Sequence, residues 1–232
     1  MADVPLTWLG HASFRLDSPE GKRIYIDPWL GNPKCPESER EPERIDVIAL
    51  THGHGDHVGE TVELAKQFEP EVVANVELKG WLAAQGAPVE NQAPGSNKGG
   101  TVEAAGVKFT LTNAFHSSSS DDGAYLGEAA GIVVGLQNGT TIYFAGDTCV
   151  FGDMELIGRI YSPEVAVLPI GGHFTMDPRE AGVALELLGT KRCIPCHFGT
   201  FPLLAGTPEE LCRHAPGGVE IVALEPGETT TV

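Results

Sequence analysis

The most constraining feature of this sequence is the segment THGHGDH at residues 51–57. It directly follows residues 46–51, whose continuous apolar character predicts a buried strand. Imidazole nitrogens and carboxylate oxygens are the ligands that zinc and related divalent ions prefer. In an extended loop His52 and His54 point the same way, so both can reach one ion. The segment therefore predicts a metal site at the end of a strand.

The second half of this segment lies where a helix is predicted to begin. Apolar residues recur at helical spacing over 58–68. The positive end of that helix disfavours a protonated imidazole, so we expect His57 to stay neutral and available as a ligand. Gly53 and Gly55 would let the backbone fold closely around the ions. The competing interpretation is a solvated polar turn, which the ligands described next disfavour.

Three single polar residues follow other predicted strands, where sites are usually built. They are His116, Asp147 and His197. A lone His or Asp in such a place is more often a capping or turn residue, but three of them beside the histidine-rich segment favour ligands. The predicted metal ligands are His52, His54, Asp56, His57, His116, Asp147 and His197.

Hydrophobic periodicity predicts strand pairs first and strand–helix alternation afterwards, in each half of the chain. Asn138-Gly139 is a strong hairpin signal, and Asp177 and Gly189 are predicted to cap a helix. The predicted strands are 4–9, 12–17, 23–27, 46–51, 71–75, 107–113, 131–137, 140–145, 164–169, 192–196 and 219–224, with helices over 58–68 and 77–85, after Asp147, and from Asp177 and Thr207. This order predicts two αβ halves packed sheet to sheet, with helices outside, as one domain over 1–232.

Composition narrows the classes of partner. The 232 residues carry a formal net charge of −17, which makes binding to nucleic acid unfavourable. No apolar run is long enough to cross a membrane, and residues 1–8 lack the basic region and apolar core of a secretory signal. The five cysteines are most simply reduced thiols. We therefore expect a cytoplasmic protein that acts on a small molecule, with homo-oligomerisation left open.

The order of these motifs resembles the metallo-β-lactamase superfamily. The pattern is H-x-H-x-D-H, a lone His, Gly-Asp-Thr and a final His, and it extends over nearly the whole chain. The segments at 8–12, 26–28, 114–118 and 169–176 further resemble the UPF0173 branch of metal-dependent hydrolases, close to the ascorbate-phosphate lactonase-like proteins.

The resemblance implies a metallo-β-lactamase αββα four-layer sandwich of two mixed sheets face to face, with the site at the edge between them. It implies that His52, His54 and His116 hold a first metal and that Asp56, His57 and His197 hold a second. Asp147 would bridge the two ions, and Asp27 would orient a ligand histidine from behind.

Two divalent ions about 3.5–4 Å apart can share a water and ionise it near neutral pH. The hydroxide would attack a carbonyl carbon or phosphorus, so we expect a hydrolase of a small ester, lactone or phosphodiester. Zinc is the expected metal, and Mn²⁺, Fe²⁺ or Ni²⁺ also suit the ligands. The alternatives are a promiscuous or catalytically silent metal-binding module, and a nuclease or phosphodiesterase acting on nucleic acid.

Other residues are candidates for direct roles in catalysis. His11 and His173 lie beside glycines after apolar strands and, with Asp56, are the catalytic candidates. A hydrogen-bonded structural role is the alternative for both histidines. The polar loop 117–122 is either a lid over the substrate or a solvated loop, and 198–201 is a candidate apolar pocket wall. The Cys193-x-x-Cys196 pair fits a buried strand better than a redox or zinc motif.

Overall fold

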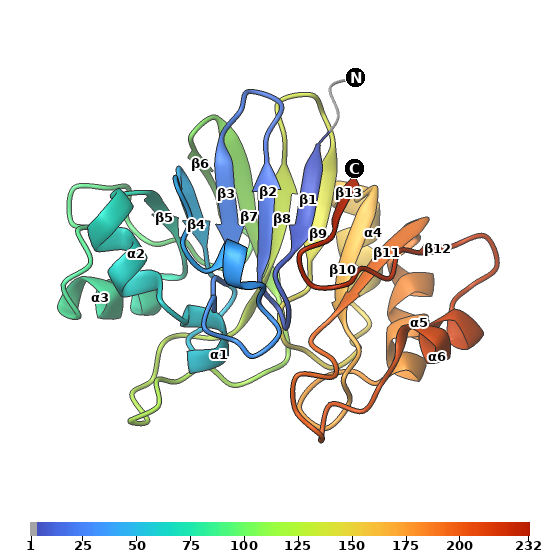
Figure 1. Cartoon of the computed structure of the whole chain (residues 1–232). Coiled ribbons are helices and arrows are strands. Elements are labelled where there is room, and N and C mark those ends of the chain that lie inside the picture. The colour runs from blue at the N-terminus through green and yellow to red at the C-terminus, as the bar shows by residue number, and fades with distance from the viewer. Residues whose placement is uncertain (1–3) are drawn as a thin grey trace.

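The computed structural model describes residues 4–232, which form two sheets packed face to face with helices on the outer faces (Figure 1). The first sheet has the order β13-β1-β2-β3-β4-β5 and the second has the order β12-β11-β10-β9-β8-β7-β6. The first contains β1 (Pro5–Trp8), β2 (Phe14–Asp17), β3 (Arg23–Ile26), β4 (Val47–Ala49), β5 (Glu71–Val73) and β13 (Thr229–Thr231). The second contains β6 (Thr101–Ala104), β7 (Val107–Asn113), β8 (Ala130–Gly135), β9 (Thr141–Phe144), β10 (Val165–Pro169), β11 (Arg192–Cys196) and β12 (Glu220–Ile221).

Both sheets are mixed. The strands β1, β2 and β3 pair antiparallel, whereas β3, β4 and β5 pair parallel. In the second sheet β6 to β9 are antiparallel and β9 to β12 are parallel. The helices are α1 (Gly55–Val58), α2 (Thr61–Phe68), α3 (Val76–Ala84), α4 (Met154–Tyr161), α5 (Pro178–Leu188) and α6 (Pro208–His214), besides a 3₁₀ turn at Glu37–Glu39. This is the four-layer arrangement that the resemblance implies.

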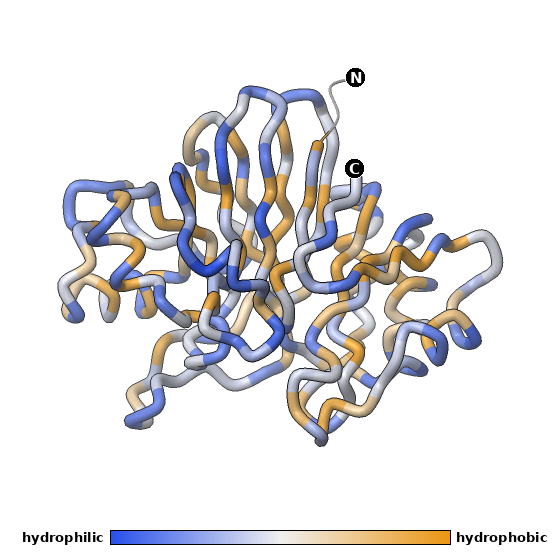
Figure 2. Tube along the Cα trace, in the orientation of Figure 1, coloured by the Kyte–Doolittle hydropathy of each residue, from blue (hydrophilic) through white to orange (hydrophobic). Residues whose placement is uncertain are grey.

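Alternation along each strand builds three apolar layers. Ile24 and Ile26 of β3 pack into the core between the sheets, and Tyr25 between them packs outward against the layer under α2 and α3. The two sheets meet in contacts such as Phe14 with Phe144, whose ring centroids are 5.7 Å apart. A third layer lies between the second sheet and helices α4, α5 and α6. The apolar strands and polar connections are visible along the chain in Figure 2.

Several local predictions are confirmed. Asn138-Gly139 forms the turn between antiparallel β8 and β9, with a φ of 92° at Gly139 that suits glycine. Asp177 caps α5 by accepting a hydrogen bond from the backbone N–H of Glu180 at 2.8 Å, and Gly189 ends it in the left-handed conformation.

Other predictions need correction. The helix expected over 58–68 is two helices, α1 and α2, because the chain turns at Gly59. A Cβ at Gly59 would lie 2.4 Å from the Cα of Trp29, so this close approach admits glycine only. The strand expected over 219–224 is reduced to β12, and the sequence did not predict β6 or β13.

Residues 4–232 contain no helix that is long and apolar enough to cross a membrane. The expectation that residues 1–8 carry no secretory signal falls partly on residues 1–3, which lie outside the described residues.

Candidate metal centre

The predicted ligands lie together because the strands that precede them end at the same edge of the sandwich. β7, β9 and β11 run in the same direction, so the loops that follow them emerge on one side of the second sheet. His116, Asp147 and His197 are in these loops. The segment 51–57 follows β4 in the first sheet and meets them there, close to α1 in the lower part of Figure 1.

One group of donors consists of His52, His54 and His116, whose donor atoms lie within 4.8 Å of one another. Nε2 of His52 and Nδ1 of His54 are 2.9 Å apart, as expected if both side chains point the same way from an extended segment. Burial lowers the pKa of all three imidazoles. They are therefore neutral near pH 7, which leaves ring nitrogens free to bind a cation.

A second group consists of His11, Asp56, His57 and His197, again with donor atoms within 4.8 Å of one another. Asp56 and His57 lie in α1, and His197 follows β11. Burial acts to lower the pKa of His197, but the carboxylate of Asp147 outweighs it and raises that pKa to about 9. The three residues that the resemblance places on a second metal therefore meet, together with a fourth.

The fourth residue, His11, was predicted as a catalytic candidate and not as a metal ligand. Its Nε2 lies 3.0 Å from Oδ2 of Asp56, and its Nδ1 lies 2.9 Å from Oγ1 of Thr200. His11 is fully buried, and burial lowers its pKa to about 4. The backbone N–H of His197 donates to the carbonyl of His11 at 2.9 Å, which ties the turn after β1 to the end of β11.

Asp147 lies between the two groups. Its Oδ1 is 3.3 Å from Nε2 of His57, and its Oδ2 is 3.2 Å from Nε2 of His197 and 3.5 Å from Nε2 of His116. Burial alone would raise the pKa of Asp147, but His197 and His57 hold it well below its ordinary value. An ionised carboxylate thus occupies the position from which both groups can be reached.

Asp27 lies behind the centre, as the resemblance implies. Its Oδ2 is 2.8 Å from Nδ1 of His57, and it accepts hydrogen bonds from both the backbone N–H and the hydroxyl of Thr51. The expectation that a helix start keeps His57 neutral is wrong. Burial opposes its protonation, but Asp147 and Asp27 outweigh burial and raise the pKa of His57 well above its ordinary value.

Unsatisfied buried atoms test whether the centre fits a cation. Nε2 of His57 lies 3.3 Å from Oδ1 of Asp147 and Nε2 of His197 lies 3.2 Å from its Oδ2, but these two nitrogens and Oδ1 of Asp147 are buried without a hydrogen bond of ordinary geometry to the described residues. Leaving buried polar atoms unpaired costs free energy, and a divalent cation would satisfy nitrogen and oxygen donors together. The residues present therefore fit bound metal.

The centre opens to solvent through a hollow of about 620 Å³. Its lining residues are Trp29, His54, Gly55, Asp56, Ser119, Ser120, Asp121 and Phe201. The polar loop after His116 is held in place, because Ser118 accepts a hydrogen bond from the backbone N–H of Gly53 and the backbone N–H of Ser120 donates to the carbonyl of Ala124. Of the segment 198–201 that was expected to form an apolar wall, only Phe201 lines this hollow, and Phe198 stacks on Trp8.

His173 is not part of this centre. It is exposed, packs edge-on against Phe174, and lines a different hollow together with Gly172 and Arg179. Cys193 and Cys196 are buried free thiols, and burial raises the pKa of both, which agrees with the packing role predicted for them.

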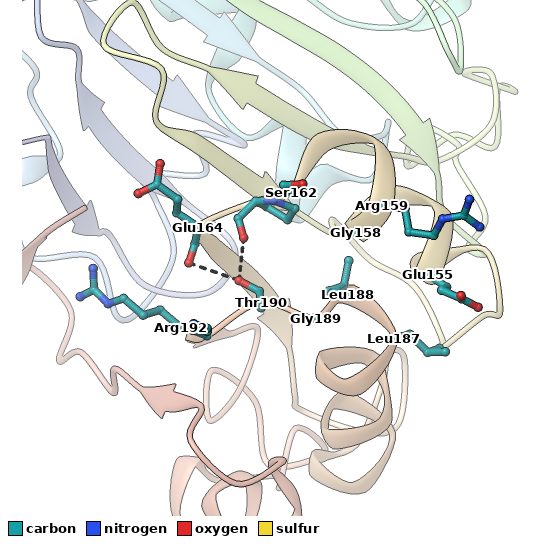
Figure 3. Close-up of a pocket in the computed structure, with 12 residues that line it drawn as sticks. Glu155, Gly158, Arg159, Ser162, Glu164, Leu187, Leu188, Gly189, Thr190 and Arg192 are labelled. Carbon is teal, nitrogen blue, oxygen red and sulfur yellow. Dashed lines mark hydrogen bonds between the residues drawn. The ribbon is translucent and has the colours of Figure 1, made fainter.

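A separate hollow of about 600 Å³ lies at the opposite ends of the parallel strands (Figure 3). Glu164 precedes β10 and Arg192 begins β11, whereas the predicted ligands follow the carboxyl ends of strands. Thr190 lines this hollow, and its hydroxyl donates to the carbonyl of Pro163 at 2.8 Å. No histidine or cysteine is among its described lining residues, so this hollow has no part in the metal centre.

Comparison with known proteins agrees with this geometry. Residues 22–198 match the family model of the β-lactamase superfamily domain. A UPF0173 metal-dependent hydrolase from Herpetosiphon aurantiacus is 51% identical over 100% of this chain and 99% of its own length. One from Koribacter versatilis is 47% identical over 97% of each chain.

Among solved structures, the metallohydrolase Igni18 from Ignicoccus hospitalis superposes with a TM-score of 0.85 at 34% identity, over 99% of this chain and 98% of its own. Family model, full-length relatives and superposed structure all point to one group. The chain therefore belongs to the β-lactamase superfamily and, within it, to the UPF0173 metal-dependent hydrolases.

Proposed function

We propose that this protein is a dinuclear metallohydrolase that cleaves a small ester, lactone or phosphodiester. His52, His54 and His116 would hold one cation, and Asp56, His57 and His197 would hold the other. Zinc suits this set of nitrogen and oxygen donors, as do Mn²⁺, Fe²⁺ and Ni²⁺. The substrate would be a small molecule, since a net charge of −17 disfavours nucleic acid.

The observation that carries the proposal is the position of Asp147. Its Oδ2 faces both groups, at 3.5 Å from Nε2 of His116 in the first and 3.2 Å from Nε2 of His197 in the second, and its Oδ1 lies 3.3 Å from Nε2 of His57 in the second. A carboxylate has two oxygens, so this side chain is suited to contact both cations and fix their separation. Its negative charge would offset part of the charge of the two cations.

Two divalent cations, when bound, would ionise a water near neutral pH and polarise the oxygen of the bond to be cleaved. The chain's own groups hold the remaining geometry. Asp56 lines the opening, and its ionised carboxylate can only accept hydrogen bonds. Nε2 of His11 therefore donates to Asp56, and Nδ1 accepts from the hydroxyl of Thr200.

The hydrogen bonds from Thr200 through His11 orient Asp56. They add no charge to the centre near pH 7, because burial lowers the pKa of His11 to about 4. His57, in the same group as Asp56, has a similar support, since Asp27 holds Nδ1 of His57 from the side away from Asp147. Supports of this kind fix ring orientation and tautomer at metal sites.

A hydrolysis screen tests the proposal. Metal-loaded protein is assayed against p-nitrophenyl phosphodiesters, lactones and thioesters, beside protein stripped with a chelator. We expect turnover in one class, loss of that turnover on chelation and its return when metal is restored. Firm binding of metal without turnover in any class would identify a silent metal-binding module and refute the proposed hydrolase.

A further inference from the structure

We propose that the opening of the metal centre selects substrates whose non-reacting part is uncharged, planar and apolar. This inference rests on the proposed function and concerns the portion of the substrate that would extend from the reacting bond toward solvent. It distinguishes a substrate with an aromatic or similar flat group from one that carries an additional carboxylate or phosphate.

One wall of the opening is aromatic. The rings of Trp29 and Phe201 have centroids 6.1 Å apart at an interplanar angle of 31°. Each ring lies edge-on to the His11 ring, with a centroid distance of 5.1 Å for Trp29 and 5.8 Å for Phe201. The aromatic wall therefore packs against His11, the residue that contacts Asp56, next to the proposed second cation.

This wall is accessible and partly fixed in place. Phe201 is 39% exposed although it is a large apolar side chain, and Trp29 is half-buried. The backbone N–H of Trp29 donates to the carbonyl of Asp27 at 2.8 Å, and its Cα packs against Gly59. An exposed, positioned aromatic pair beside a reactive centre offers a face for a flat apolar group, since aromatic contacts favour offset or edge-on stacking.

The lining contributed by the loop after His116 is polar and acidic. It consists of Ser119, Ser120 and Asp121. The carboxylate of Asp121 lies against Gly55, so that a Cβ at Gly55 would be 2.9 Å from Oδ1 of Asp121. Asp121 therefore lies against Gly55, the residue that precedes Asp56 in the chain.

No lysine or arginine is among the described residues that line the opening. Lys34 lines a different hollow, to which Phe201 also contributes, and its ammonium lies 5.7 Å from the centroid of the Phe198 ring. The bound cations would neutralise a negative charge at the reacting bond. A second anionic group on the substrate would lie near Asp121, with no lysine or arginine of the lining to pair with it. Like charges repel each other, so Asp121 would disfavour binding of such a substrate. The net negative charge of the protein adds to this repulsion.

The first experiment measures selectivity in turnover. The p-nitrophenyl ester of 3-phenylpropanoate is compared with the same ester carrying a para-carboxylate on the phenyl ring, and an equivalent pair is used if the screen identifies another bond class. We expect kcat/KM to be roughly tenfold higher for the uncharged compound at low salt.

Two pairs of variants locate the effect. Asp121→Lys should reduce the ratio of kcat/KM for the uncharged ester to kcat/KM for the carboxylated ester by roughly three- to tenfold. Asp122 is a neighbour that does not line the opening, so Asp122→Lys should leave this ratio within about twofold of wild type. Phe201→Ala should lower kcat/KM for the uncharged ester by roughly three- to tenfold. Leu203→Ala, which removes a comparably exposed apolar side chain outside the opening, should not.

A binding measurement separates this inference from the proposed hydrolysis. Quenching of tryptophan fluorescence is followed on adding 3-phenylpropanamide or its para-carboxylate, with Trp29→Phe to identify the signal from the opening. We expect a Trp29-dependent response that favours the uncharged amide.

Selective quenching without hydrolysis of any substrate class would refute the proposed function and support the inference. Hydrolysis with equal kcat/KM for both members of a pair, unchanged in Asp121→Lys, would overturn the inference and leave the function standing. If neither amide caused Trp29-dependent quenching, the inference would also be overturned.

Discussion

Nδ1 of His57 lies 2.8 Å from Oδ2 of Asp27, and this contact joins the metal centre to the end of β3. Asp27 adopts a left-handed φ of 46° and also accepts from the backbone N–H of Thr51 at 2.8 Å. A single buried carboxylate thus positions a predicted ligand and the start of the segment that contains it.

Asp27→Asn should therefore weaken metal binding without replacing any ligand. The amide keeps the shape but can no longer accept all of these hydrogen bonds through both oxygens. Loss of such a supporting group typically costs about 10–100-fold in metal affinity or activity. Competition with a chromophoric chelator measures the affinity, and Asp17→Asn, in a surface ion pair with Arg23, serves as the control. Wild-type affinity in Asp27→Asn would remove Asp27 from the account.

The two histidines proposed from the sequence should differ in effect. His11→Ala removes the partner of Asp56 at 3.0 Å and should lower kcat by roughly 10–100-fold. His173 is exposed and lines another hollow, so His173→Ala should stay within about twofold of wild type. Steady-state kinetics on the substrate class found by the screen gives both values. If His173→Ala lowered kcat and His11→Ala did not, the contact of His11 with Asp56 would have no importance for turnover.

That the predicted ligands lie close together could be expected from the sequence, because it follows from local order. A buried strand followed by polar ligands repeats along the chain, and parallel strands bring their carboxyl ends to one edge. The place of His11 in the centre could not be predicted, because it depends on left-handed φ angles of 88° at Gly10 and 52° at His11. These angles turn the side chain inward, whereas the sequence shows only that His11 lies beside a glycine after an apolar strand.

Long-range packing limited the prediction in two other places. The break between α1 and α2 depends on contact of Gly59 with Trp29, which is distant in sequence. The pKa of His57 depends on Asp27 and Asp147, which belong to different sheets, and not on the helix in which it lies. Helix dipoles contribute little in a single-turn helix beside two carboxylates.

Gly53→Ala should destabilise the protein. A Cβ at Gly53 would lie 2.5 Å from Cδ1 of Leu126, a buried side chain, and overpacking of this kind costs about 1–3 kcal/mol. Gly80→Ala in α3 meets no atom within 4 Å and should raise the free energy of unfolding by up to about 1 kcal/mol. Urea unfolding of metal-free protein measures both. Equal stability of the two variants would contradict the packing described around the 51–57 segment.

Asp147→Asn should lose most hydrolytic activity, at least about 100-fold, and weaken the binding of at least one cation. The substitution keeps the shape of the side chain but removes the charge that lies between His57, His116 and His197. Asp121→Asn and Asp122→Asn should leave the metal content unchanged. Circular dichroism establishes that each variant is folded before metal and activity are compared. Normal turnover with two tightly held ions in Asp147→Asn would exclude the bridging role.

The central claim is that two groups of ligands joined by Asp147 hold two cations in each chain. Elemental analysis of protein purified without chelator and dialysed against zinc or manganese tests it most directly. We predict a ratio that approaches two divalent ions per chain and falls to about one in Asp147→Asn. A ratio in the wild-type protein that stays at one or below in excess Zn²⁺ or Mn²⁺ would contradict the two-metal centre.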